Sequence, residues 1–310
     1  MKVLITPRGF ANYGVDIVKE MEAKGLTVHY NNTGKQYTPE QFLELAKDAD
    51  GIIVGVDVMD RAMMEQCPNL KVVCKFGVGT DNIDLDYAKE RGIYVGRTVG
   101  SNSIAVAEHV VALMFAESKN LYPSIRDVKN HGWSKPTGRE VSGKTLGIIG
   151  FGQIGKHLAQ FAVGLGMKVL AYDVFEIPDE VAEQYHVTKA TQDEIIENSD
   201  FISLHVPLLD STRDMISADE LKRMKNDACL INAARGGIVN EKALYEALVN
   251  HEIRSACFDV YSDEPPKADD PLVALDNFLL TPHTAARSRE SERRTCEMSS
   301  QIVMEQLLGK

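Results

Sequence analysis

Apolar runs and helical spacings alternate along the first hundred residues of this chain. Short apolar runs predict strands over residues 3–6, 26–30, 51–54, 70–76 and 93–95. Helices are predicted over 15–24 and 39–46, and the second is opened by the capping box Thr38-Pro39-Glu40-Gln41. Strands separated by helices favour a parallel sheet with helices on both faces.

The rest of the chain repeats this alternation. A long amphipathic helix is predicted over 104–119. Six apolar runs then predict strands, and they contain Leu146, Val169, Ile202, Leu230, Ala256 and Leu279. The capping box Ser217-Ala218-Asp219-Glu220 and the N-cap residue Asn240 mark two helix starts, and the last helix is predicted over 288–308. The pattern therefore predicts two open α/β sheets of unequal size.

One strand–helix junction has the sequence Gly150-Phe151-Gly152-Gln153-Ile154-Gly155. An apolar run over 145–149 precedes it, a helical spacing over 154–165 follows it, and Asp173 ends the next apolar run. A Gly-x-Gly-x-x-Gly pattern in this context, with an acid at the end of the next strand, is typical of a dinucleotide-binding site.

The residue types at this junction suit that chemistry. Gly152 lets the backbone approach a pyrophosphate, whose charge is stabilised by the free N–H groups at the helix N-terminus. Asp173 can bind both ribose hydroxyls, and its carboxylate would repel the 2′-phosphate of NADP. Val174, Phe175 and Glu176 supply no cation to offset that repulsion. We therefore expect NAD as the cofactor.

Composition and charge exclude several other classes of function. The net charge of −11 argues against a nucleic-acid-binding surface, which requires basic patches. The five cysteines form no CxxC pair, which suits a reducing compartment and gives no metal signature. The N-terminal residues lack the apolar stretch of a signal peptide, and no apolar run reaches membrane-spanning length. We expect a cytoplasmic protein with no metal, no nucleic-acid partner and no membrane partner.

Three further segments place reactive side chains just beyond predicted strands. They are Asn232-Ala233-Ala234-Arg235-Gly236-Gly237, the acidic segment Asp259-Val260-Tyr261-Ser262-Asp263-Glu264, and Thr281-Pro282-His283. In open α/β sheets, ligands bind outside the carboxyl ends of the strands. An arginine, a carboxylate and an imidazole at that edge are the groups that bind an anion and transfer a proton.

Three more motifs accompany these segments and the glycine pattern. They are Phe76-Gly77-Val78-Gly79-Thr80-Asp81-Asn82-Ile83-Asp84, Ala105-Val106-Ala107-Glu108-His109 and His205-Val206-Pro207-Leu208. With them, the chain resembles the D-isomer-specific 2-hydroxyacid dehydrogenases over nearly its whole length. That family includes phosphoglycerate dehydrogenase, glyoxylate and hydroxypyruvate reductases, and D-lactate dehydrogenase.

The resemblance implies an NAD-dependent oxidoreductase that acts on CH–OH donors and interconverts a D-2-hydroxy acid and its 2-keto acid by hydride transfer. Arg235 would hold the substrate carboxylate and polarise the C2 oxygen. His283 would give the proton in reduction and take it in oxidation, while Glu264 would bind the other imidazole nitrogen and favour the imidazolium form. The substrate carboxylate would also be bound by a short segment that comprises Phe76, Gly77, Val78 and Gly79.

The resemblance also implies a set of NAD-binding residues. Asp259 is the expected partner of the nicotinamide carboxamide, with Ala233 as its backbone neighbour. Further contacts are expected from the glycine pattern, the following strand ends and the catalytic segments: Val106, Gly152, Gln153, Ile154, Gly155, Asp173, His205, Val206, Pro207, Thr212, Asn232, Arg235, His283 and Ala285. For His109, inside the predicted helix over 104–119, we expect a structural role.

Two positions depart from the family pattern. Ala285 and Ala286 stand soon after His283, where the family usually has glycine. Gly55 stands where phosphoglycerate-specific members tend to place a phosphate-binding arginine. A phosphorylated substrate would therefore need another cation, such as Arg8 or Lys75.

The architecture implied is α/β, with two doubly wound parallel-sheet domains. Residues 1–101 and 286–310 would form a flavodoxin-like substrate domain, and residues 102–285 a Rossmann NAD-binding domain. A homodimer formed through the helix from Ile104 is implied by the family, and Trp133 would belong to a dimer arm or to internal packing.

The alternative function is a non-catalytic, NAD-sensing interaction protein, because the C-terminal-binding-protein corepressors resemble this family and keep the same three catalytic side chains. The motifs leave the substituent at C3 of the substrate open.

Overall fold

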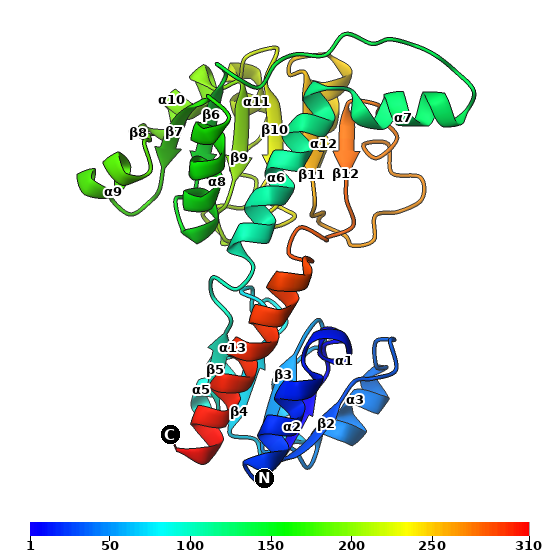
Figure 1. Ribbon diagram of the computed structural model, residues 1–310, viewed down its shortest axis with the longest axis vertical. Coiled ribbons are helices and arrows are strands. Elements are labelled where there is room, and N and C mark those ends of the chain that lie inside the picture. The colour runs from blue at the N-terminus through cyan, green and yellow to red at the C-terminus, as the bar shows by residue number, and fades with distance from the viewer. Residues whose placement is uncertain (310) are drawn as a thin grey trace. The chain divides into compact units, whose positions relative to one another are not determined.

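The computed structural model describes residues 1–309, whose helices and strands are shown in Figure 1. The chain divides into two compact units, one made of Met1–Asn102 with Arg287–Lys310 and the other of Ser103–Ala286. The C-terminal helix therefore returns to the unit in which the chain begins.

The first unit is built round a five-stranded parallel sheet in the order β2-β1-β3-β4-β5, which is the strand order of flavodoxin-like folds. Its strands are β1 (Lys2–Ile5), β2 (Thr27–Tyr30), β3 (Gly51–Val54), β4 (Val72–Lys75) and β5 (Tyr94–Arg97). Its helices are α1 (Gly9–Tyr13), α2 (Val15–Ala23), α3 (Pro39–Ala46), α4 (Arg61–Glu65), α5 (Leu85–Glu90) and α13 (Arg289–Leu308).

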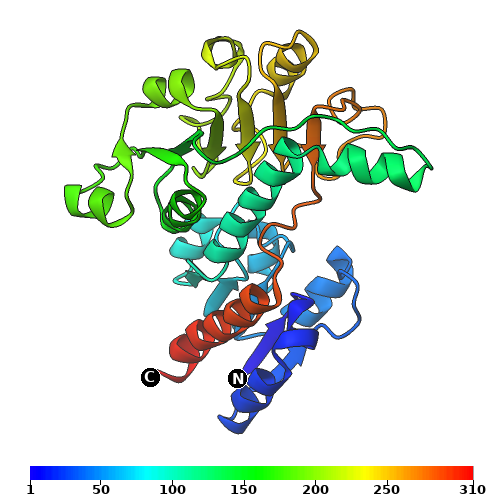
Figure 2. The same cartoon turned by 45° about the horizontal axis from the view of Figure 1, so that its top comes forward.

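Alternating side chains of these strands fill two separate cores. Val3 and Ile5 pack with α1, α2 and α13 on one face of the sheet, whereas Leu4 packs with α3, α4 and α5 on the other. Figure 2 shows α13, drawn in red, beside the blue helices α1 and α2. Successive side chains of a strand point to opposite faces, so a strand that is apolar at every position requires a cover on both sides.

The second unit contains a seven-stranded parallel sheet in the order β12-β11-β10-β9-β6-β7-β8. Its strands are β6 (Thr145–Ile149), β7 (Lys168–Tyr172), β8 (Thr188–Lys189), β9 (Phe201–Leu204), β10 (Cys229–Asn232), β11 (Ser255–Phe258) and β12 (Phe278–Leu280). Its helices are α6 (Ser103–Ser118), α7 (Leu121–Lys129), α8 (Gln153–Gly164), α9 (Asp179–Gln184), α10 (Gln192–Asn198), α11 (Ala218–Arg223) and α12 (Glu241–Val249). If β6 is taken as the first strand, β8-β7-β6-β9-β10-β11 has the strand order of a Rossmann sheet, and β12 extends it by one strand.

This sheet is also covered on both faces. Leu146 and Ile148 of β6 pack with α6 and α8 on one side, while Ile149 and Ile202 pack with α10, α11 and α12 on the other. Helices α6 and α8 contact each other directly. The predicted fold class, α/β with two doubly wound parallel sheets, is confirmed.

The helix starts follow the local signals. Thr38 accepts a hydrogen bond from the Gln41 N–H, and Asn240 accepts one from the Ala243 N–H at 2.9 Å. The helix α7 was not predicted, because Pro123 and its polar neighbours obscure the pattern, yet proline is tolerated in a first helical turn.

Two features are absent from residues 1–309, a metal-binding cluster of side chains and a membrane-spanning helix. Within residues 1–309, no group of three or more His, Cys, Asp or Glu side chains is arranged to hold a metal ion. Over the same part of the chain, no helix combines the length and apolar character needed to cross a bilayer.

Candidate active site

The strands of the second unit end in the residues that the sequence singled out. Gly150, Asp173 and His205 follow β6, β7 and β9, and Ala233, Asp259 and Thr281 follow β10, β11 and β12. Because these strands are all parallel, their carboxyl ends lie along one edge of the sheet. The candidate site of this unit is therefore its carboxyl edge.

The glycine pattern forms a tight turn from β6 into α8. Gly150 has a φ of 100°, and a Cβ there would lie 2.5 Å from the carbonyl oxygen of His205. A Cβ at Gly155 would lie 2.5 Å from the carbonyl oxygen of Gly150, so glycine permits α8 to pack against the turn. A Cβ at Gly152, the N-cap residue of α8, would meet no atom within 4 Å. This open helix N-terminus, with its N–H groups, suits a bound phosphate.

Asp173 joins the end of β7 to the glycine turn. Its Oδ2 accepts a hydrogen bond from the Phe151 N–H at 2.7 Å, and its Oδ1 accepts one from the Phe175 N–H at 3.1 Å. Each carboxylate oxygen keeps a further lone pair. Asp173 therefore presents a fixed acceptor beside the turn, and its neighbours Val174 and Phe175 are exposed and uncharged.

His205 begins the loop after β9, where its carbonyl group lies against Gly150. The imidazole Nε2 lies 2.9 Å from Ser203 Oγ, whereas Nδ1 is buried and has no partner among the described residues. Burial lowers the pKa of His205 to about 4, so the ring is neutral at physiological pH. A buried ring nitrogen without a partner is a group that a bound ligand would satisfy.

The remaining expected cofactor contacts lie on two helices and in one loop. Gln153 and Ile154 form the first turn of α8, and Val106 is buried on α6. Val206 and Pro207 continue the loop after His205, and the Thr212 hydroxyl donates to the carbonyl oxygen of Pro207 at 2.6 Å. Thr212 therefore stabilises the loop itself.

Asn232 shapes the loop that carries Arg235. Its buried side chain donates from Nδ2 to the carbonyl oxygen of Arg235 at 2.8 Å and accepts the Ala234 N–H at 3.0 Å through Oδ1. Such an asparagine turn fixes the backbone from both sides. The Arg235 Nη1 donates to the carbonyl oxygen of Ala234 at 2.7 Å. The loop thus holds a permanent positive charge at the sheet edge.

Gly236 brings the Arg235 loop against the acidic segment. A Cβ at Gly236 would lie 2.2 Å from the carbonyl carbon and oxygen of Tyr261, so only glycine allows this approach. Tyr261 is itself anchored, because its hydroxyl donates to Asp270 Oδ2 at 2.9 Å and its ring is buried. Burial raises the pKa of the Tyr261 phenol, which therefore stays a donor. The segment that carries Glu264 is positioned by these contacts.

Glu264 and His283 form a hydrogen-bonded pair. The Glu264 Oε2 lies 2.7 Å from Nδ1 of His283, and its Oε1 accepts the Tyr261 N–H at 3.0 Å. His283 has a φ of 53°, a left-handed conformation that is uncommon outside glycine but enriched for histidine. The structure therefore brings together the carboxylate and the imidazole that the sequence singled out, and it leaves Nε2 of His283 unused by Glu264.

Asp259 lies beneath the His283 loop and is 1 % exposed. Its two oxygens accept the N–H groups of Thr284 at 2.9 Å and Ala285 at 2.7 Å. Ala285 and Ala286 are not among the residues with positive φ, so alanine stands there without backbone strain.

One contact at this edge could not be predicted from the sequence. The His109 imidazole Nε2 on α6 lies 3.0 Å from Thr281 Oγ1 and 3.5 Å from Asp259 Oδ1. No local pattern links positions that are 172 residues apart, and the structural role expected for His109 stays a prediction.

In the first unit, the expected substrate-binding segment follows β4. Gly77 has a φ of 135°, and its N–H donates to Thr98 Oγ1 at 2.9 Å. Its carbonyl oxygen accepts the Thr98 N–H at 2.9 Å, and Phe76 packs on the unit's core. The N–H groups of Val78 and Gly79 form no hydrogen bond with another described residue. Two adjacent backbone donors of this kind suit an anion such as a carboxylate.

Comparisons with known proteins agree with this geometry. Residues 111–285 match the model of a protein family that is described as "D-isomer specific 2-hydroxyacid dehydrogenase, NAD binding domain". A D-3-phosphoglycerate dehydrogenase of Methanocaldococcus jannaschii is 41% identical over 278 residues, which are 88% of this chain and 52% of that protein. A hydroxypyruvate reductase of Thermotoga maritima is 36% identical over 267 residues, 84% of this chain and 86% of that protein. The solved structure of a D-lactate dehydrogenase with NAD+ from Lactobacillus jensenii has a TM-score of 0.80 and 32% identity, and the match covers 100% of this chain and 98% of that one.

The extent of these matches differs between the relatives. The chain spans about half the length of the phosphoglycerate dehydrogenases that it matches, and most of the hydroxypyruvate reductase. The segment matched to the family contains the glycine turn, Arg235, Glu264 and His283. This chain therefore belongs to the D-isomer-specific 2-hydroxyacid dehydrogenase family.

Proposed function

We propose that this protein is an NAD-dependent oxidoreductase that interconverts a D-2-hydroxy acid and its 2-keto acid by hydride transfer. The observation that carries this proposal is the Glu264–His283 pair, which shares a sheet edge with the glycine turn and Arg235. A dinucleotide site, a fixed guanidinium and an oriented imidazole are the groups that this reaction requires. The relatives are named as dehydrogenases and reductases, which favours the enzyme over the NAD-sensing interaction protein.

In reduction, two side chains act on the reacting carbonyl group. The bound cofactor supplies the hydride for C2 of the keto acid. Arg235 polarises the C2 oxygen and holds the substrate carboxylate through its planar guanidinium. His283 transfers the proton on Nε2 to the alkoxide oxygen, so the hydroxy acid leaves and the imidazole becomes neutral. In oxidation, the neutral imidazole accepts that proton again.

Glu264 serves this transfer by orienting His283. Its carboxylate accepts the hydrogen bond of Nδ1–H at 2.7 Å, which places the transferable proton on Nε2.

The second unit is the proposed NAD-binding domain. The start of α8 would hold the pyrophosphate, Asp173 the ribose hydroxyls and Asp259 the nicotinamide carboxamide. A ligand at this edge is supported by the open space at Gly152 and by Nδ1 of His205, which has no partner within residues 1–309. NAD is proposed rather than NADP, because Asp173 would repel a 2′-phosphate while Val174 and Phe175 carry no compensating charge.

The first unit is the proposed substrate domain, in which the N–H groups of Val78 and Gly79 bind the substrate carboxylate. A small substrate without a phosphate, such as glyoxylate or hydroxypyruvate, is favoured by the surroundings of Gly55. The Lys75 ammonium donates to the carbonyl oxygen of Gly55 at 2.6 Å and to Asn82 Oδ1 at 2.7 Å, so these contacts already use two of its three donors. Arg8 is directed to the carbonyl oxygen of Gly34.

A homodimer was expected through the helix from Ile104, which is α6; we propose it instead on the apolar surface of the next helix, α7, because α6 packs against α8 within its own unit. Four side chains on one face of this helix are 44–56 % exposed, namely Leu121, Tyr122, Ile125 and Val128. Trp133, in the segment after the helix, is 76 % exposed. A contiguous apolar face of this kind marks an interaction surface, and we assign it to a second copy of this chain.

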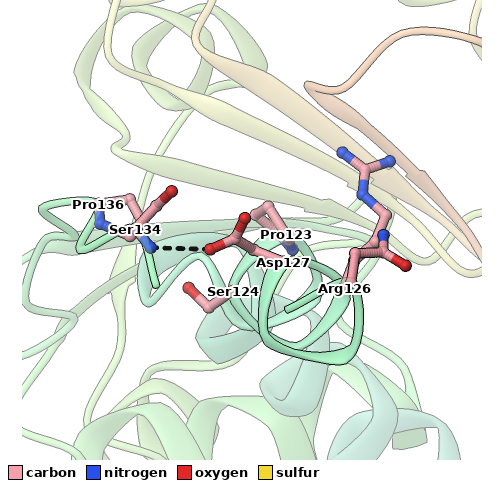
Figure 3. Close-up of a pocket in the computed structure, with 7 residues that line it drawn as sticks. Pro123, Ser124, Arg126, Asp127, Ser134 and Pro136 are labelled. Carbon is pink, nitrogen blue, oxygen red and sulfur yellow. Dashed lines mark hydrogen bonds between the residues drawn. The ribbon is translucent and has the colours of Figure 1, made fainter. Parts of the chain in front are cut away.

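The helix α7, which carries the apolar face, contacts two other segments of its unit. Figure 3 shows the pocket of about 320 Å³ between α7 and the following segment, where Asp127 accepts the Ser134 N–H at 2.8 Å. Arg126 forms an ion pair with Asp276 at 3.0 Å, which ties α7 to the loop before β12. The helix therefore contacts another loop of its unit while its apolar side chains remain exposed.

The compartment proposed is the cytoplasm. All five cysteines are free and buried, as expected for a protein of a reducing compartment.

A substrate panel tests the proposed reaction. The purified protein would be assayed with NADH and glyoxylate, hydroxypyruvate, pyruvate and phosphohydroxypyruvate, followed by NADH absorbance, and with NAD and the D- and L-hydroxy acids in the reverse direction. Activity on small keto acids and on D-isomers is expected. Oxidation of L-isomers alone would overturn the proposal, and so would a protein that binds NADH tightly and reduces none of these acids.

A further inference from the structure

The backbone that carries His283 is tied to a single buried carboxylate. Asp259 accepts the N–H groups of Thr284 and Ala285, the two residues that directly follow His283. On the other side of His283, its own N–H donates to the carbonyl oxygen of Thr281 at 2.9 Å. The position of His283 therefore depends on Asp259 and Thr281, which hold the loop from both ends.

His109 completes this arrangement from a different element. Its Nε2 on α6 lies 3.0 Å from Thr281 Oγ1 and 3.5 Å from Asp259 Oδ1. Because an ionised carboxylate can only accept, the Thr281 hydroxyl donates to Asp259 Oδ1 at 2.5 Å. The oxygen of the Thr281 hydroxyl keeps lone pairs, and one of them accepts the N–H of His109. The proton of a neutral His109 is thereby placed on Nε2, and the protonated ring would carry a donor there as well.

We infer that His109 is a positioning residue for the reaction, which acts on His283 through Thr281 and Asp259; the inference rests on the proposed function. Without a donor at this point, the Thr281 hydroxyl loses a partner, and so does the Asp259 carboxylate, which is 1 % exposed and hardly accessible to water. The loop from Thr281 to Ala285 then loses one of the contacts that fix it. Loss of alignment between an acid–base group and the reacting atoms lowers the rate of chemistry more than it lowers substrate binding.

Three substitutions separate this role from simple packing. His109→Gln keeps an N–H donor near the position of Nε2, His109→Leu fills similar space without a donor, and His109→Asn has a donor that is too short to reach Thr281. We expect kcat to fall about 100-fold in the Leu and Asn variants and only a few-fold in the Gln variant, with smaller changes in KM for the keto acid. Glu108→Leu, at the exposed neighbouring position on α6, is the control and should keep the kcat of the unmodified protein.

A second measurement does not depend on activity. Hydrogen–deuterium exchange of a peptide that covers residues 281–286 reports on the N–H groups bound to Asp259. We expect faster exchange in the Leu and Asn variants than in the unmodified protein and the Gln variant, at temperatures well below unfolding. If the Leu variant does not fold, the more polar Asn variant provides the same comparison.

The outcomes are distinguishable. An unmodified protein that reduces none of the acids contradicts the proposed function, while the exchange rates still test the role of His109. An active protein whose Leu and Asn variants keep kcat and exchange rates contradicts the inference. A Gln variant as slow as the Leu variant contradicts it too, since a donor at this position would then not matter.

Discussion

The Oε2 atom of Glu264 lies 2.7 Å from Nδ1 of His283, although the two residues come from different loops of the sheet edge. The second oxygen of Glu264 is held by the Tyr261 N–H, so the carboxylate has one orientation. The imidazole is oriented in turn and directs Nε2 away from Glu264. A change at Glu264 should therefore alter the orientation of His283 without removing the ring.

The first prediction concerns the hydrogen bond between Glu264 and His283. Glu264→Gln keeps the shape of the side chain, but an amide oxygen is a weaker hydrogen-bond acceptor than a carboxylate. The His283 ring should then be less well oriented, and kcat for reduction should fall by about 10–100-fold with a smaller change in KM. Steady-state reduction rates with NADH measure it. His283→Gln is the control and should lose about 10²–10⁴-fold in kcat while NADH binding persists. A Glu264→Gln variant that keeps the kcat of the unmodified protein would contradict the pairing.

The second prediction concerns the contact between the Arg235 loop and the acidic segment. In Gly236→Ala, the new Cβ would overlap the backbone carbonyl of Tyr261, so one of the two loops must move. Displacement of Arg235 relative to Glu264 should reduce kcat/KM by about 100-fold. Gly164→Ala is the matched control, because a Cβ there meets no atom within 4 Å and helical alanine is favoured over glycine. Kinetics and thermal unfolding of both variants would show whether activity falls while the fold is kept.

The third prediction concerns cofactor choice. Asp173→Asn removes the negative charge but keeps an oxygen that can accept the Phe151 N–H. We expect the preference for NADH over NADPH in kcat/KM to narrow by about tenfold, which corresponds to about 1.4 kcal/mol. Glu176→Gln removes a neighbouring charge that makes no such contact, and it should leave the preference nearly unchanged. Equal use of both cofactors by the unmodified protein would refute the assignment to Asp173.

The fourth prediction concerns stability in acid. The pKa of His205 is about 4 in the folded protein against an ordinary value of 6.5, so the unfolded chain binds more protons between these values. Stability therefore decreases as pH falls from about 6.5 towards 4, by about 2 kcal/mol at pH 5 from this residue alone. His205→Asn cannot titrate, and its loss of stability between pH 7.5 and pH 5 should be smaller by that amount. Urea unfolding at the two pH values measures the difference, and an equal loss in both proteins would show that His205 is not responsible.

The fifth prediction concerns assembly. A carboxylate at the centre of the apolar face of α7 would be buried in the proposed dimer, so Ile125→Asp should shift the protein to monomers. Sedimentation velocity over a range of concentrations measures the change. Val249→Asp, at an exposed valine on α12, is the control and should remain dimeric. A monomeric unmodified protein would exclude the interface outright.

Several elements could be predicted because their causes are local. The strands over Gly51–Val54 and Thr145–Ile149 follow from short apolar runs, and the helix after Thr38 follows from its capping box. A further capping box, formed by Thr191 and Glu194, opens α10 and is equally local in its cause. The glycine turn was also local, because its three glycines meet a strand and a helix that adjoin them in sequence.

By itself the sequence determined the order of strands and helices, the dinucleotide turn and the residue types available at the sheet edge. Only the tertiary structure decided which of them meet: Gly236 against Tyr261, Glu264 against His283, and His109 against Thr281. The physical reason is that hydrogen bonds and apolar periodicity within an element depend on neighbouring residues. The position of a side chain at the sheet edge depends instead on how distant elements pack, and α6 meets the β12 loop because α6 packs on the sheet to which β12 belongs.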